Sequence, residues 1–290
     1  MPISHIAAMM LTVLVWGLNH LAVKIGVENC PPMLFASVRL FIVALALLPF
    51  ATMPRGVTWR SLFWISFWFG TTSLGLSSFS LIGIDAATSA IIVNLGTPFT
   101  IIAGRIAFGE KFGLWRWCGV AAAFIGVALL AGEPTTIAPI YFFAAVLSIA
   151  CWAVANVLIK QLHQLSAITV NGWVSAFAAV QLAIGSTIFE SGQFETLATG
   201  DASFWGGLLF AALASSVIGH TLWNWLLHRH PINTIAPFNL LVPVVGFTAA
   251  LIVLGETLTW QKIAGGLLAL VGVAVIQARV LMTSRGSVTH

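Results

Sequence analysis

Residues 85–111 read DAATSAIIVNLGTPFTIIAGRIAFGEK, an apolar stretch that begins with an acid and ends in a cluster of charges. Nineteen uncharged residues separate Asp85 from Arg105, close to the roughly 20 residues that a helix needs to cross the hydrocarbon core of a bilayer. Asp85 is a favourable N-cap, because its carboxylate can accept hydrogen bonds from free N–H groups of the first turn. Pro98 lies inside the stretch and is tolerated in a membrane helix. The pattern predicts a transmembrane helix.

The same pattern occurs again at residues 230–257, which read HPINTIAPFNLLVPVVGFTAALIVLGET. The segment Asn94-Leu95-x-x-Pro98 corresponds to Asn239-Leu240-x-x-Pro243, and Gly109-Glu110 corresponds to Gly255-Glu256. The residues that follow match at a constant separation of 146 positions: Gly119, Gly126, Val127 and Ala128 with Gly265, Gly272, Val273 and Ala274. Several matches in one order indicate an internal repeat.

Composition places the chain in a membrane. Of its 290 residues 59% are hydrophobic and only 7% are charged, whereas soluble domains carry about 25% charged residues. The net charge of +4 is spread without a basic run, so we expect no nucleic-acid partner. The cysteines Cys30, Cys118 and Cys151 are scattered and form no metal-binding or disulfide pattern. We therefore expect a multi-pass membrane protein with no cofactor and no metal, surrounded by lipid.

Ten apolar stretches are long enough to span. We place these spans at residues 4–25, 32–51, 61–82, 86–107, 114–132, 137–160, 167–189, 203–227, 231–254 and 260–281. They divide into two units of five spans, at residues 1–134 and 135–290. The fold predicted from the sequence is an all-α membrane protein with ten transmembrane helices in two repeats.

The orientation follows from the distribution of Lys and Arg. With ten spans both termini lie on one side, and nine of the twelve basic residues fall on that side, leaving Lys24, Arg39 and Lys262 for the other. Because cytoplasmic loops carry the excess of Lys and Arg, both termini should be cytoplasmic. An odd number of spans per repeat makes the second unit inverted relative to the first. Inverted repeats around a midplane site are typical of secondary transporters.

The repeated unit, with a fourth helix that ends in Pro-x(n)-Gly-Glu and a fifth that carries spaced glycines, resembles the drug/metabolite transporter superfamily. Within it the chain is similar to the ten-helix EamA-type family, and most of all to its bacterial exporters of aromatic amino acids. The resemblance covers nearly the whole chain. It implies an inner-membrane exporter, with a cavity formed mainly by the first, third, fourth, sixth, eighth and ninth helices.

Polar residues inside the spans are the candidates for the site, since they are costly to expose to lipid and usually face a cavity or another helix. Trp16, His20 and Lys24 share one helical face, with Asn19 beside them, and Trp152, Asn156 and Lys160 repeat that face in the sixth span. The predicted cavity residues are Trp16, His20, Ser78, Asn94, Trp152, Asn156, His220, Asn224 and Asn239. Pro98 and Pro243 are the candidate hinges or gates.

Several of these residues also have a purely structural interpretation. Lys24 and Lys160 lie at helix C-termini, where they can snorkel and oppose the helix dipole. In the structural interpretation, Asn94 and Asn239 do no more than bond neighbouring helices or backbone groups. Arg39 can snorkel outward, pair with Glu28, or hold a substrate carboxylate. The spaced glycines of the fifth and tenth spans are expected to allow close helix packing.

No Asp or Glu lies in the middle of a predicted span. Proton-driven pumps for cationic drugs rely on such a carboxylate, so a neutral or zwitterionic substrate fits better. Only His20 and His220 remain as proton carriers, and burial favours their neutral form. The predicted function is therefore export of amino acids or similar small zwitterionic metabolites by alternating access, as a monomeric uniporter rather than an enzyme.

Three alternatives stay open. Two lie within the same superfamily: a flippase for lipid carriers and a multidrug exporter. The third is an intramembrane hydrolase, because Gly75-Leu76-Ser77 has the Gly-x-Ser spacing and His220 has the chemistry of a general base. A rhomboid-like protease needs a glycine after the serine, however, and Ser78 follows here; the hydrolase reading also leaves the repeat unexplained.

Overall fold

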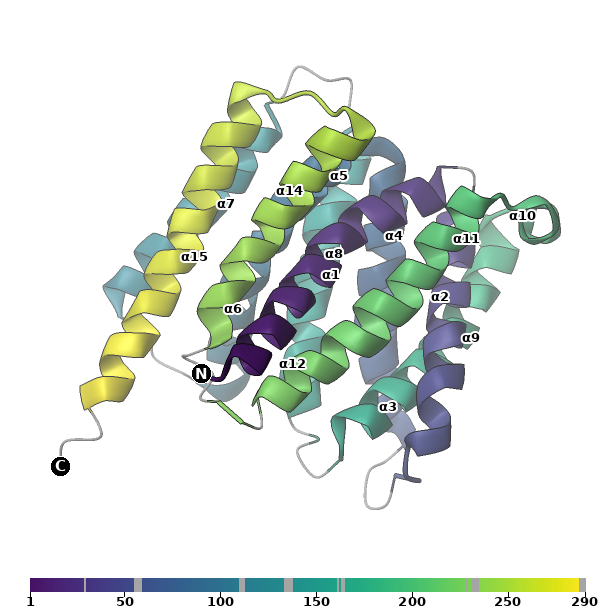
Figure 1. Ribbon diagram of the computed structural model, residues 1–290, viewed down its shortest axis with the longest axis horizontal. Coiled ribbons are helices and arrows are strands. Elements are labelled where there is room, and N and C mark those ends of the chain that lie inside the picture. Colours follow the sequence, from purple (N-terminus) through teal and green to yellow (C-terminus); the bar gives the residue numbers. More distant parts are fainter. Residues whose placement is uncertain are drawn as a thin grey trace.

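The structure is a computed structural model that describes residues 1–28, 30–54, 59–109, 113–132, 138–160, 162, 165–227, 229–230 and 235–286. For Phe108, Asn224, Leu227, Ala236, Pro237 and residues 279–286 it describes the backbone alone. Within these ranges the regular secondary structure is all helical and there is no strand. Figure 1 shows long helices packed side by side in one bundle, with the start of α1 and the C-terminal end of α15 toward the same end.

In the described part of the chain, eight helices are long and apolar enough to cross a membrane. Four of them are single α-helices: α1 (Ile3–Val27), α8 (Pro139–Lys160), α9 (Ala167–Phe189) and α15 (Trp260–Gly286). The others are composite: α2 (Pro32–Leu47) with η1 (Leu48–Phe50), α3 (Trp59–Ser66) with η2 (Phe67–Leu74) and α4 (Gly75–Gly83), α5 (Ala86–Ile92) with η3 (Val93–Leu95) and α6 (Gly96–Phe108), and α11 (Ala202–Leu209) with η4 (Phe210–Gly219) and α12 (His220–Leu227).

The remaining two predicted spans are shorter apolar helices. They are α7 (Leu114–Leu130), and η5 (Ala236–Leu240) continued by α14 (Leu241–Leu254). Seventeen residues of α7 extend about 25 Å at 1.5 Å per residue, less than the full hydrocarbon core. A short helix, α10 (Gln193–Thr199), lies in the link between α9 and α11. The structure thus supports a multi-pass helical membrane protein.

Two composite helices change their winding around a proline. Asn94 and Asn239 lie in the 3-10 segments η3 and η5, four residues before Pro98 and Pro243. A proline has no N–H to donate to the carbonyl four residues earlier. The backbone tightens into a 3-10 turn there, and short 3-10 pieces are a common local adjustment. The two copies of the Asn-Leu-x-x-Pro segment therefore produce the same local structure.

Two other composite helices contain π-helical segments, η2 and η4. In each, a hydroxyl group bonds the carbonyl five residues earlier: Thr72 Oγ1 donates to the Phe67 carbonyl at 2.5 Å, and Ser216 Oγ donates to the Ala211 carbonyl at 3.0 Å. These bonds satisfy carbonyls in the widened turns. π-helical turns inside α-helices are often found at functional sites, and both segments contribute residues to the cavity described below.

The glycines of α7 and α15 bring these two helices into backbone contact. A Cβ atom added at Gly126 would lie 2.6 Å from the Gly265 carbonyl oxygen, and one at Gly272 would lie 2.6 Å from the Gly119 oxygen. Small residues at such crossings let helix backbones approach closely. The prediction that these glycines allow close packing is confirmed. Figure 1 shows α7 and α15 side by side at the edge of the bundle.

A buried ion pair joins the start of α5 to the start of α15. Asp85 caps α5 as predicted, with its side chain accepting from the Thr88 N–H at 2.9 Å. Its second carboxylate oxygen lies 2.5 Å from Nζ of Lys262, whose side chain is fully buried. We call this side of the molecule, where α1 and α4 finish and α2, α5 and α15 begin, the Asp85 end.

Two more carboxylates cap helices at the Asp85 end. Glu256, in the link between α14 and α15, accepts from the first two N–H groups of α5 at 2.7 and 2.9 Å. Glu190, at the end of α9, accepts from the Met33 and Leu34 N–H groups of α2 at 2.7 and 3.1 Å. Burial raises the pKa of Glu256, although the two N–H donors act in the opposite direction. Negative groups at helix N-termini stabilise the free N–H donors there.

Lys24 makes a further connection at this end. Its Nζ donates to the Leu81 carbonyl at 2.7 Å and to the Ile84 carbonyl at 3.0 Å, where α4 finishes. Lys24 lies in the last turn of α1 and its ammonium group binds the C-terminal end of a neighbouring helix, so its contacts are structural and it does not line the cavity. Together these contacts hold the ends of α1, α4, α5 and α15 to one another.

Candidate functional site

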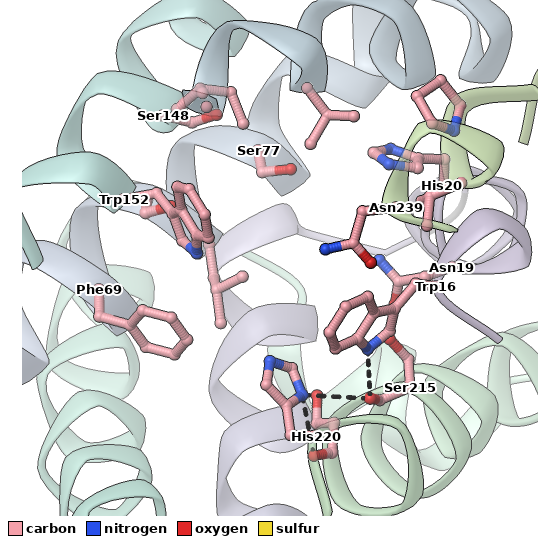
Figure 2. A pocket seen from close by; sticks show the side chains of 18 of the residues that line it. Trp16, Asn19, His20, Phe69, Ser77, Ser148, Trp152, Ser215, His220 and Asn239 are labelled. Atoms are coloured by element: carbon pink, nitrogen blue, oxygen red, sulfur yellow. Dashed lines mark hydrogen bonds between the residues drawn. The ribbon is translucent and has the colours of Figure 1, made fainter. Parts of the chain in front are cut away.

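A cavity of about 310 Å³ lies within the bundle, and its lining residues come mostly from the middle of the apolar helices. This volume is within the range of pockets that bind small molecules, roughly 300–1,000 Å³. None of the residues that hold the Asp85 end together lines it. Figure 2 shows its walls from close by, with Trp152 and Phe69 on one side and Trp16, Asn19, His20 and Asn239 on the other.

Trp16 and His220 form an aromatic group on one wall. Trp16 Nε1 donates to the Ser215 carbonyl at 3.2 Å, and its ring centroid lies 5.3 Å from that of His220 and 5.6 Å from that of Trp223. His220 Nδ1 lies 3.2 and 3.1 Å from the carbonyl oxygens of Ser215 and Ser216. A ring nitrogen that faces carbonyl oxygens carries the proton, which leaves Nε2 as an acceptor. The π-helical segment η4 thus orients both rings.

The opposite wall carries Trp152 of α8. A Cβ atom at Gly96 would lie 3.1 Å from the Trp152 ring, so the glycine at the start of α6 leaves space for the indole. Trp16 and Trp152 provide flat apolar surfaces on opposite walls, while the Trp16 N–H is already bonded to the Ser215 carbonyl. Such surfaces suit a ligand with an apolar or aromatic portion.

Three asparagine amides and a second histidine also line the cavity. Asn94 Nδ2 donates to the Ile91 carbonyl at 2.9 Å, and His20 Nδ1 lies 3.0 Å from the Ser89 hydroxyl. Asn19 Oδ1 and Asn239 Oδ1 are buried and have no hydrogen-bond partner among the described residues. Free acceptors of this kind are available to a ligand that donates hydrogen bonds.

Arg39 of α2 also lines the cavity. It is 6% exposed, and its Nη2 and Nε lie 3.0 and 3.4 Å from the Ser216 hydroxyl. In the described part of the chain it forms no ion pair, so the expected pairing with Glu28 is wrong. It also does not snorkel outward, because its side chain is buried and reaches the cavity. Of the three expectations, contact with a ligand remains.

The structure brings together six of the nine predicted cavity residues: Trp16, His20, Asn94, Trp152, His220 and Asn239. Ser78 is buried but does not line the cavity, and its neighbour Ser77 does. The π-helical segment η2 precedes this serine and changes the winding, so the face extrapolated for a regular helix is shifted. Pro243 lines the cavity, whereas Pro98 is buried outside it.

Asn156 does not line the cavity. It lies one turn beyond Trp152 on α8, and its Nδ2 donates to the Trp152 carbonyl at 2.9 Å. Its predicted place in the lining is wrong, because the cavity does not extend a further turn along α8. The side chain of Asn224 lies outside the described residues, so its predicted position stays a prediction.

Sequence reasoning missed several lining residues. Most of them have small polar side chains or lie on three helices that were not expected to contribute. The polar residues that were missed are Ser73, Thr97, Ser148, Asn171, Ser175, Ser215 and Gln277. Hydroxyl groups bond their own helix and leave no periodic signal. Gln277 lies near the end of α15, where a polar residue is unremarkable in the sequence. The helices α2, α9 and α15 therefore join the expected set.

No group of three or more potential metal ligands occurs in the described part of the chain. Ser77 and His220 both line the cavity but do not bond to each other, and the His220 Nδ1 faces backbone carbonyls. The nucleophile–base contact that a hydrolase requires is not formed between them.

The sequence profile of the EamA-like transporter family matches residues 3–132 and again residues 139–278. The chain belongs to the EamA-like transporter family. The resemblance predicted from the repeated stretch is thus confirmed, and the protein is a multi-pass membrane protein of a transporter family.

Three of the relatives carry names that refer to efflux or export. A protein of Salmonella typhimurium named "Probable amino-acid metabolite efflux pump" is 29% identical over 96% of this chain and 97% of its own length. A protein of Escherichia coli with the same name is 27% identical over 92% of each chain. The "Probable terminal-alkyne amino-acid exporter" of Streptantibioticus cattleyicolor is 23% identical over 97% of this chain and 96% of its own.

A solved structure, titled "Crystal structure of protein", is similar with a TM-score of 0.66 at 18% identity. The match covers 97% of this chain and 98% of that one. At this identity the likeness concerns the fold alone. It extends over the whole helical bundle, including the helices that line the cavity.

Proposed function

We propose that this EamA-family protein is an inner-membrane secondary transporter that exports amino acids or closely related small metabolites through the central cavity. The observation that carries the proposal is a cavity of about 310 Å³ inside an apolar bundle, lined by two tryptophans and by amide and imidazole groups. The names of the Salmonella typhimurium and Escherichia coli relatives support the substrate class. The substrate binds between the indoles, and its polar groups meet the amides.

The transport cycle in this proposal is alternating access by two inverted five-helix repeats, residues 1–134 and 135–290. In this proposal ten spans put both termini on one side, the excess of Lys and Arg makes that side the cytoplasm, and the protein works as a monomer. The matched 3-10 segments before Pro98 and Pro243, and the matched π-helical segments, support two structurally similar units. The two prolines are the flexible points, and the Asp85 end is the outer gate.

Transport in this proposal is uncoupled. No aspartate or glutamate occurs among the described residues that line the cavity, so no carboxylate there exchanges a proton during the cycle. This also argues against a proton-driven pump for cationic drugs. Counterflow in proteoliposomes without an ion gradient tests it: labelled amino acid should accumulate against unlabelled amino acid inside. A requirement for an imposed pH difference would refute uncoupled transport.

Replacement of the cavity aromatics should impair transport. We expect His220→Ala or Trp152→Ala to reduce the initial rate of counterflow by roughly tenfold or more, because each removes a group worth about 1.4 kcal/mol or more in substrate binding. Cys118→Ala is the matched control, since Cys118 is exposed on the outside of α7 and should leave the rate unchanged. Equal rates for all three variants would place the substrate elsewhere.

The proposed topology can be tested by labelling single cysteines from outside the cell in a background without Cys30, Cys118 and Cys151. Glu195→Cys in the exposed helix α10 should react with a membrane-impermeant maleimide. Lys111→Cys, in a link that lies outside the described residues, should react only after the membrane is permeabilised. The reverse pattern would overturn the orientation.

A further inference from the structure

The guanidinium group of Arg39 is a buried cation that has no counter-ion among the residues that the structure describes. Nε and Nη2 both point to one hydroxyl, that of Ser216, and Nη1 makes no hydrogen bond with any described residue. The residue is 6% exposed and lines the cavity. An isolated buried charge is costly unless it is paired and hydrogen-bonded. A protein that keeps this arrangement at its cavity has a site for an anionic group.

The cavity itself does not supply that anion. Arg39 is the one charged side chain among the described lining residues, with no Asp, Glu or Lys beside it. The fork of N–H groups on a guanidinium matches a carboxylate with two parallel hydrogen bonds. The counter-ion of Arg39 is therefore expected to arrive with the ligand, as a single carboxylate.

The same cavity offers uncharged acceptors. The side-chain oxygens of Asn19, Asn239 and Gln277 are buried and unpaired among the described residues, and all three residues line the cavity. Figure 2 shows Asn19 and Asn239 close together beside Trp16. A neutral N–H donor satisfies such oxygens at little cost. An ammonium group would lose its hydration without meeting a carboxylate, and this is unfavourable inside a membrane.

The charges decide between two classes of amino-acid metabolite. A zwitterion bound at Arg39 leaves one uncompensated positive charge in the cavity, whereas a monoanion leaves none. We propose, building on the transport function proposed above, that the cavity selects monoanionic N-acylated amino acids over free amino acids. The carboxylate binds Arg39, the amide N–H donates to the unpaired amide oxygens, and an apolar side chain lies between Trp16 and Trp152.

The test compares five phenylalanine-like compounds as competitors for uptake of labelled N-acetylphenylalanine into proteoliposomes. They are N-acetylphenylalanine, phenylalanine, 3-phenylpropionate, N-acetylphenylalaninamide and phenylalaninamide. We expect N-acetylphenylalanine to compete best, and phenylalanine to require roughly tenfold to hundredfold higher concentrations. The carboxylate without an N–H should rank between these two, and the cationic amide should not compete.

Variants of Arg39 test its role as the specificity residue. Arg39→Gln should remove the preference for the carboxylate, so that N-acetylphenylalaninamide competes as well as N-acetylphenylalanine. Arg39→Lys should retain part of the preference, because the charge stays while the fork is lost. Ser37→Ala is the matched control on α2: its hydroxyl is buried against the Ala179 carbonyl, away from the cavity, and the ranking should not change.

The outcomes separate the two proposals. If labelled phenylalanine is taken up and N-acetylphenylalanine competes no better than phenylalaninamide, the preference for monoanions is wrong while amino-acid transport stands. If neither labelled phenylalanine nor labelled N-acetylphenylalanine is taken up, both proposals fail. Should Arg39→Gln not fold, the ranking of the five compounds on the unaltered protein still decides.

Discussion

Replacing Gly126 by leucine is expected to destabilise the protein severely. A Cβ atom at this position would lie 2.6 Å from both the Gly265 carbonyl oxygen and the Ala269 amide nitrogen. Both are backbone atoms, so no side chain can rotate away, and α7 and α15 would have to separate. Overpacking in a well-packed interior costs about 1–3 kcal/mol, and a clash with two backbone atoms of α15 should reach the upper part of that range or exceed it.

The measurement is thermal unfolding of the purified protein in detergent, together with the yield of monodisperse material. Gly206→Leu is the matched control, because an added Cβ on α11 meets no atom within 4 Å. That variant should unfold like the unaltered protein, since leucine is also the better helix former. A normal unfolding temperature for Gly126→Leu would show that α7 and α15 are not in backbone contact.

Removal of the Asp85 carboxylate is the second change with a large expected effect. Asp85→Ala leaves the ammonium group of Lys262, whose side chain is fully buried, without the carboxylate 2.5 Å away. Breaking a buried pair from one side costs about 3–5 kcal/mol, because the remaining buried charge loses its counter-ion. The variant also loses the cap on the Thr88 N–H of α5. We expect a large fall in the unfolding temperature.

Asp201→Ala separates the two contributions. Asp201 caps α11 through the Phe204 N–H at 2.8 Å, and none of the ion pairs found in the described part of the chain includes it. Losing this cap alone should cost about 1 kcal/mol. If both alanine variants lose the same stability, the contact between Asp85 and Lys262 contributes nothing beyond the cap.

Most helices of the bundle could be predicted from the amino-acid sequence, because the formation of a membrane helix depends on local composition. An uncharged run of span length has few alternatives in lipid, since every backbone polar group must be satisfied within the segment. The Asp85 cap and the glycine contacts of α7 and α15 are likewise local or pairwise features. The cost of polar groups in lipid also explains why Trp16, His20 and Asn239 were predicted at the cavity.

The rest depends on how each helix is rotated about its axis and how far it slides along its neighbours. The turn of η2 places Ser77 rather than Ser78 at the cavity, and such a shift is invisible to a fixed 3.6-residue period. Asn156 has the right face but the wrong depth. Gln277 lines the cavity although α15 was not among the helices expected to form it.

The amino-acid sequence by itself determined that this protein is a bundle of apolar helices from the EamA-like family, with a repeated Asn-Leu-x-x-Pro segment and polar groups directed inward. Only the tertiary structure decided whether Arg39 and Lys262 line the cavity or stabilise the bundle. The sequence had assigned both cations to the same side of the membrane. Lys262 meets the Asp85 carboxylate and becomes part of the scaffold. Among the residues whose contacts are described, Arg39 hydrogen-bonds only to the hydroxyl of Ser216, and it lines the cavity. The physical reason is that a buried charge takes its role from the groups that packing brings within a few ångströms.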